Sequence, residues 1–119
     1  MTETRIYNLE KRTLVFGQNI VALCKGFKSE PLTRPMLIQI IRSGTSIGAN
    51  YVEATGASSK KDFAHKIFIC KKEAQETKYW LAIISSTFIE QENLIKNLQK
   101  ECQELVLIFN KIASSARAE

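Results

Sequence analysis

Apolar side chains recur every three to four residues along four segments of this chain, with polar residues between them. This spacing is typical of amphipathic helices, which carry their apolar residues on one face. No segment alternates apolar and polar residues with a period of two, so no β-strand is predicted. The pattern places helices at roughly residues 8–27, 35–55, 60–85 and 90–114.

Short polar connections separate the four segments. Gly26, Pro31 and Pro35 interrupt the pattern after the first segment, and a proline fits the first turn of the helix that follows. Ser59 and Asp62 have the spacing of a capping box, so a third helix is predicted to begin beside them. Because short turns join antiparallel neighbours, the chain is predicted to be a single all-α domain, an antiparallel up-down four-helix bundle.

The stretch RSGTSIGANYVEATGASSKKDF, residues 42–63, is rich in glycine, serine and threonine. Two of its glycines, Gly44 and Gly48, fall on the apolar face of the second predicted helix. A phosphate-binding loop would need no such order, and the stretch has no Gly-Lys-Ser/Thr ending. Glycine costs about 1 kcal/mol relative to alanine within a helix. The pair is therefore predicted to allow the close approach of a neighbouring helix.

The opposite face of the same helix carries four polar residues, here called the polar stripe: Arg42, Ser46, Asn50 and Glu53. One interpretation is a solvated helix face; the other is that the stripe faces a partner helix, another subunit or a ligand. Arg42 and Glu53 lie roughly 16 Å apart at a rise of about 1.5 Å per residue, so they cannot pair with each other. We expect the stripe to be engaged with other groups.

Three runs of consecutive apolar residues exceed what a bundle helix needs: 67–70, 79–84 and 105–109. Consecutive helical residues point in all directions, so part of each run would lie outside the core, and exposed apolar patches mark interfaces. A homo-oligomer is therefore predicted. Its candidate interface residues are Phe68, Tyr79, Trp80 and Ile83. The two neighbouring aromatic residues are the preferred anchors; the alternative is a larger core that leaves Trp80 half exposed.

Charge and cysteine content narrow the possible partners. The net charge of +5 suits a polyanion, although such a bias is also common on ordinary surfaces. No apolar run reaches the roughly 18 residues of a membrane span, and the N-terminus lacks a signal-peptide core, so a cytoplasmic protein is expected.

Cys24, Cys70 and Cys102 lie within apolar helical patterns. They are predicted to pack in the core, and neither a metal nor another cofactor is expected.

The second and third predicted helices carry a further pattern: Arg42-x3-Ser46-Ile47-x2-Asn50-x2-Glu53, then Gly56, Ser59, Asp62-Phe63 and Glu73-x2-Glu76. With this pattern, and over most of its length, the chain resembles the 23S rRNA intervening-sequence protein family. The resemblance implies a four-helix bundle that assembles into a ring-like pentamer. Some members are encoded inside sequences that interrupt the large ribosomal RNA gene. A related branch includes accessory proteins of diversity-generating retroelements, which engage a reverse transcriptase and nucleic acid.

Catalysis has little support in the sequence. The single histidine, His65, would have to serve any Ser-His-Asp arrangement, and no nucleophile-elbow motif is present. Helical HEPN-type ribonucleases place an arginine four to six residues before a histidine, but here that window holds serine and lysine. Glu73 and Glu76 lack the Glu-x-x-His motif of di-iron bundles. The protein is predicted not to be an enzyme.

Two functions remain in competition. The first is an RNA- or nucleic-acid-associated accessory protein, whose contacts would come from lysines of the third helix: Lys60, Lys61, Lys66, Lys71 and Lys72. Acidic residues are interleaved with these lysines, and lysine reads phosphate charge rather than base edges. The second is a protein-interaction scaffold that binds no nucleic acid.

Overall fold

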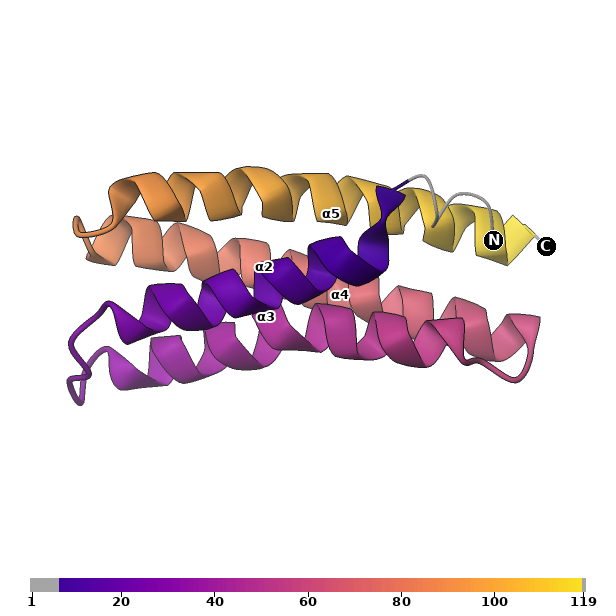
Figure 1. The fold of residues 1–119 in the computed structure, drawn as a ribbon, viewed down its shortest axis with the longest axis horizontal. Helices are drawn as coiled ribbons and strands as arrows, with labels where there is room; N and C mark the ends of the chain where they lie inside the picture. Colours follow the sequence, from indigo (N-terminus) through magenta and orange to yellow (C-terminus); the bar gives the residue numbers. More distant parts are fainter. Residues whose placement is uncertain (1–6, 119) are drawn as a thin grey trace.

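The computed structural model describes residues 7–118, which form four α-helices joined by short turns (Figure 1). The helices are α2 (Leu9–Lys25), α3 (Arg34–Thr55), α4 (Lys60–Thr87) and α5 (Glu92–Ala118). Each runs antiparallel to the one before it, and extents of 46 × 23 × 20 Å describe a rod two helices wide. The predicted all-α, up-down bundle is confirmed. Within the described residues, none of the helices combines the length and apolarity that a membrane span requires.

The helix ends differ from the sequence prediction by a few residues, because side chains from distant turns fix them. α2 ends at Lys25, and Phe27 leaves the helix to stack on Phe88 beyond α4, with ring centroids 4.1 Å apart. The Gln91 amide donates a hydrogen bond at 3.1 Å to the Leu23 carbonyl oxygen, which also accepts from the Gly26 backbone N–H at the end of α2. The turns at this end of the bundle are thereby tied together.

The start of α4 is capped by Ser59. The Ser59 hydroxyl accepts a hydrogen bond from the Asp62 backbone N–H at 3.0 Å, as the capping-box spacing predicts. The Asp62 carboxylate accepts in turn from the backbone N–H of Ser58, one residue before the cap, at 3.3 Å. α4 therefore begins at Lys60, where the sequence predicted it.

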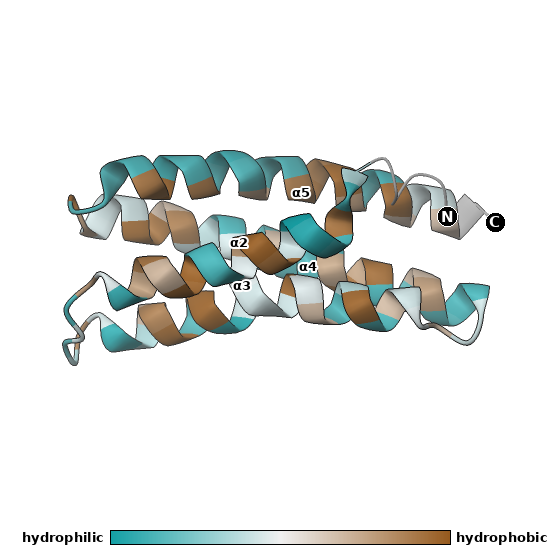
Figure 2. Ribbon diagram, viewed as in Figure 1, coloured by the Kyte–Doolittle hydropathy of each residue, from teal (hydrophilic) through white to brown (hydrophobic). Residues whose placement is uncertain are grey.

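All four helices contribute to one apolar core. Its largest fully buried side chains include Phe16 and Ile20 of α2, Ile40 and Ile47 of α3, Ile67 and Leu81 of α4, and Leu105 and Phe109 of α5. α5 is hydrophobic on the side that faces the bundle and hydrophilic on its outer edge (Figure 2). Of the neighbouring pairs, α3 and α4 share the most extensive contact, while α2 packs on α3 and much less on α5.

The three cysteines lie in this core as free thiols, as predicted. Burial raises the pKa of Cys70 and of Cys102 to about 12, and that of Cys24 to about 11. Among residues 7–118, no group of three histidine, cysteine or acidic side chains is placed to hold a metal ion.

Glycines lie where α2 and α3 approach each other. A Cβ atom on Gly44 would stand 2.9 Å from Ile20 Cγ1, and one on Gly48 would stand 3.1 Å from Thr13 Oγ1. A Cβ on Gly17 of α2 would meet Thr45 Cα at 3.6 Å, an ordinary van der Waals distance. The pair on α3 therefore faces α2 at distances that leave no room for a larger residue without movement of its neighbours.

Candidate functional site

The polar stripe of α3 lies against α4, and its two charged ends form ion pairs across the helix boundary. Arg42 donates to the Glu73 carboxylate at 3.1 Å and also to the Glu76 carboxylate. Further along, Lys66 of α4 donates to the Glu53 carboxylate at 2.8 Å. We call these five residues the α3–α4 ion pairs. They hold α3 and α4, the two helices with the most extensive contact, in one register.

The middle of the polar stripe bonds to its own helix. The Ser46 hydroxyl donates to the Arg42 carbonyl oxygen at 2.5 Å, and the Asn50 amide donates to the Ser46 carbonyl oxygen at 2.8 Å. The buried polar link between the helices is instead made by Thr77, whose hydroxyl donates to the Ser43 hydroxyl at 2.9 Å. Sequence reasoning missed this pair, although Ser43 and Thr77 both lie on core-facing positions.

The electrostatics of the ion pairs favour the charged forms. A hydrogen bond from Arg42 is the main cause that lowers the pKa of Glu76, and the Trp80 indole N–H donates to the same carboxylate at 3.1 Å. The hydrogen bond to Glu76 raises the pKa of Arg42, and the bond to Glu53 raises that of Lys66. Glu73 is the most buried member, with a side chain 10% exposed. This geometry holds α3 and α4 together.

The charges of α4 separate onto different sides of the helix. At about 100° per residue, the acidic residues Asp62, Glu73 and Glu76 share the side that faces α3. The outward side and the side toward α5 carry only basic charge, from Lys60, Lys61, Lys71, Lys72 and Lys78. We call these five the α4 lysine face. No ion pair within the described residues involves any of them.

Lys66 does not belong to the α4 lysine face. It was predicted to contact nucleic acid, but the structure turns it toward α3, where it pairs with Glu53. Lys71 and Lys72 lie beside Phe68, a half-exposed aromatic residue, and the Lys71 ammonium lies 5.7 Å from the Phe68 ring centroid. Phe68 is therefore placed among the lysines rather than with the other predicted interface residues.

The remaining predicted interface residues gather on the C-terminal half of α4. Tyr79 is 59% exposed, and its ring meets that of Trp80 edge-on, with centroids 5.2 Å apart. Trp80 is half-buried against the core and bound to Glu76, so it is a less open anchor than predicted. Ile83, one turn beyond Tyr79, is also half-buried. We call these three residues the α4 apolar ridge.

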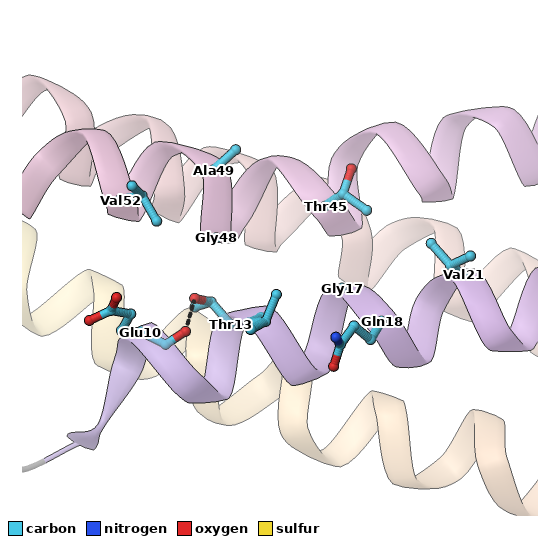
Figure 3. A pocket seen from close by; sticks show the side chains of 10 residues that line it. Glu10, Thr13, Gly17, Gln18, Val21, Thr45, Gly48, Ala49 and Val52 are labelled. Atoms are coloured by element: carbon cyan, nitrogen blue, oxygen red, sulfur yellow. Dashed lines mark hydrogen bonds between the residues drawn. The ribbon is translucent and has the colours of Figure 1, made fainter.

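A groove between α2 and α3 was not predicted. Figure 3 shows its lining: Gly17 and Gly48 lie where α2 and α3 touch, at the floor of the groove, and Val21 and Val52 border it from opposite sides. The groove encloses about 500 Å³, and its other lining residues include Leu14, Thr45 and Glu10. We call it the α2–α3 groove.

The fold and these surfaces define a small helical-bundle protein with separate charged and apolar exposed surfaces. The model of the 23S rRNA-intervening sequence protein family matches residues 7–111, and the chain belongs to that family. A crystal structure of a protein of unknown function from the S23 ribosomal protein family of Bacteroides thetaiotaomicron is similar, with 36% identity and a TM-score of 0.80. That similarity covers 88% of this chain and 97% of the Bacteroides chain. No curated protein matches the sequence.

Proposed function

We propose that this protein is a non-catalytic, homo-oligomeric nucleic-acid-binding protein of the cytoplasm, which holds the phosphates of RNA on the α4 lysine face. The observation that carries the proposal is the separation of charge on α4. The acidic residues interleaved with the lysines in the sequence are turned toward α3, and Arg42 forms ion pairs with two of them. Five lysines are thus left on a surface without an acidic side chain of their own helix, although Lys72 stands one turn from Glu76.

The chemistry of this surface favours phosphate contact. A lysine ammonium acts as a point charge that attracts phosphate but does not distinguish base edges, so little sequence preference is expected. Phe68, half-exposed beside Lys71, adds a ring on which an unpaired base can stack. Single-stranded RNA therefore fits the α4 lysine face better than a duplex does.

Assembly would strengthen binding that is weak in one chain. Each copy brings a net charge of +5, and linked copies raise the effective concentration of every further site on the same RNA. The family resemblance favours a ring-like pentamer, in which the α4 lysine face would be repeated around the assembly. The exposed apolar residues of α4 support self-association as the way in which the copies are held.

The test is fluorescence anisotropy with a labelled single-stranded RNA at about 50 and 200 mM salt, the range over which several phosphate contacts matter strongly. Lys61→Glu with Lys71→Glu should weaken binding at least tenfold. The slope of log affinity against log salt should fall by about 0.7 for each phosphate that the variant no longer neutralises. A matched control, Lys25→Glu with Lys28→Glu, makes the same charge change in exposed residues at the other end of the bundle.

Each result decides between the candidate functions. Equal losses in the two double variants would show that only total charge matters, and the α4 lysine face would be wrong as a site. No binding at 50 mM salt would leave the protein-interaction scaffold, for which the exposed ring of Tyr79 is the supporting observation.

A further inference from the structure

Two apolar surfaces of this chain point in different directions. The α2–α3 groove opens between α2 and α3, whereas the α4 apolar ridge lies on α4, which stands behind α2 in the view of Figure 1. One chain cannot bring its own ridge into its own groove. A contact between the two surfaces would have to join separate copies.

Most of the exposed lining of the α2–α3 groove is apolar, and burying it against another molecule would be favourable. Leu14 is 60% exposed and Val52 is 58% exposed at its edges, although both lie within well-formed helices. Gly17 and Gly48 lie at the helix contact and add no side chains that would cover these apolar residues. Exposed apolar surface arranged around a concave site marks a place where another molecule packs.

The charges at the two surfaces are complementary. Among the described residues that line the groove, the acidic Glu10 is the one charged side chain. At the ridge, Lys78 precedes Tyr79 and has no ion pair within the described residues, whereas the Glu76 carboxylate that binds Trp80 is paired with Arg42. Such a match of sign favours the encounter of the two surfaces and disfavours contact of a groove with a second groove.

We infer that the α2–α3 groove of one copy receives the α4 apolar ridge of the next copy, with Tyr79 as the residue that enters it. The inference rests on the self-association in the proposed function and names the two surfaces that make it. The contact is head-to-tail, because each copy offers one surface and receives the other. Head-to-tail contacts generate closed rings when the rotation between copies closes.

This arrangement leaves four of the five residues of the α4 lysine face free, because only Lys78 adjoins the ridge. Tyr79 follows Lys72 by seven residues, about 10 Å along the helix at a rise of about 1.5 Å per residue. Lys60 and Lys61 lie further away, at the opposite end of α4. Assembly through the ridge and binding of phosphate at the start of α4 can therefore occur together.

The experiment uses two single variants that each block one surface. Leu14→Arg places a long charged side chain in the groove, and Tyr79→Arg removes the aromatic ring from the ridge. Both residues are more than half exposed, so neither change should unfold the bundle. Masses are measured by light scattering at micromolar concentration, for each variant alone and for an equimolar mixture.

The expected result is specific to a head-to-tail contact. Each variant alone should be a monomer, and the mixture should form a dimer with one copy of each and nothing larger. In that dimer the intact ridge of the Leu14→Arg chain fills the intact groove of the Tyr79→Arg chain, and the two remaining surfaces are both blocked. Because both substitutions introduce the same charge, the blocked surfaces repel each other rather than pair.

Other results overturn the inference in distinguishable ways. If Tyr79→Arg alone keeps the mass of the unmodified protein, the ridge is not a contact, and the groove binds another groove or a different molecule. If Leu14→Arg alone keeps that mass, the groove is not a contact between copies. If the unmodified protein is itself a monomer, the self-association in the proposed function fails, while its RNA-binding part is judged by the separate titration.

A matched control separates surface blocking from a general effect of added charge. Leu107→Arg makes the same change at a leucine of α5 that is 57% exposed and outside both surfaces. It should leave the assembled mass unchanged. Loss of the oligomer in this variant too would show that any added arginine dissociates it, and the two surfaces would be without support.

Discussion

Replacement of Arg42 by alanine should loosen the packing of α3 on α4. Arg42 donates to Glu73 and Glu76, and its removal would leave Glu73, a side chain 10% exposed, without its cation. Breaking a fully buried pair costs about 3–5 kcal/mol, whereas exposed pairs contribute less than about 1 kcal/mol. Because Arg42 is 46% exposed and Glu76 32% exposed, we expect an intermediate cost of about 2 kcal/mol.

The assay is urea unfolding followed by circular dichroism at one fixed chain concentration, since assembly makes stability depend on concentration. Arg34→Ala is the control, because the Arg34 side chain is exposed and its guanidinium donates to the Ser29 hydroxyl. It should change the free energy of unfolding by less than about 0.5 kcal/mol. In a Glu73→Gln background, Arg42→Ala should cost less than in the unmodified protein, because the buried charge is gone.

The effect of Arg42→Ala should also depend on pH. The hydrogen bond from Arg42 lowers the pKa of Glu76 in the folded protein. A carboxyl group with a lowered folded pKa contributes stability above its unfolded pKa and loses it as the pH falls through the folded value. The gap between the unmodified protein and the variant should be full at pH 7 and narrow below about pH 4. A gap under about 0.5 kcal/mol at pH 7, or one that stays constant in acid, would refute this account of the pairs.

Two further outcomes follow from the packing of α2 and of the thiols. Gly44→Ala should lower the melting temperature, because the new Cβ atom would stand only 2.9 Å from a core isoleucine. Gly17→Ala, whose Cβ atom would have ordinary contact distances, should raise the melting temperature through helix propensity. Equal shifts in the two variants would contradict the close approach of α2 and α3. Cys24, Cys70 and Cys102 should react with a thiol reagent at pH 8 only on unfolding, because burial raises each pKa well above 8; rapid labelling of the native protein would contradict that burial.

The fold could be predicted because it depends on periodicity, which each helix carries in its own sequence. The ends of α2 and α5 could not, since they depend on contacts between distant turns. Phe27 leaves α2 to stack on Phe88, and the Gln91 amide caps α2 from the start of α5. No pattern within residues 8–27 reports on a side chain more than sixty positions away.

The polar stripe shows a second limit. The sequence placed Arg42 and Glu53 on one face of α3 and required partners for both, but the partners depend on which side of α4 faces that stripe. The sequence does not distinguish Lys66 from the other lysines of α4, because it does not show which side of α4 faces α3. In the structure, Lys66 lies on that side and pairs with Glu53. The rotation of α4 about its axis also separates Glu73 and Glu76 from the lysines, which the linear order had interleaved.

The sequence carries a pattern of small residues that indicates where the α2–α3 groove lies. Gly17 lies within the apolar stripe of α2, and small residues recur on the facing part of α3 at Thr45, Gly48 and Ala49. Each alone indicates only close packing. A groove arises because these small residues oppose each other at the same height, which the sequence does not show before the pairing of α2 with α3 is known.

An even number of antiparallel helices returns the chain to the end at which it started. α5 finishes at the end of the rod where α3 turns into α4, and α2 begins in the same half of the rod, short of that end (Figure 1). Lys60 and Lys61 open α4 directly after that turn. A purification tag or fused domain attached after α5 would therefore stand at the same end of the rod as the first two lysines of the proposed RNA surface. Binding experiments call for cleavable tags, and an insertion in the turn between α2 and α3 would place a label at the far end.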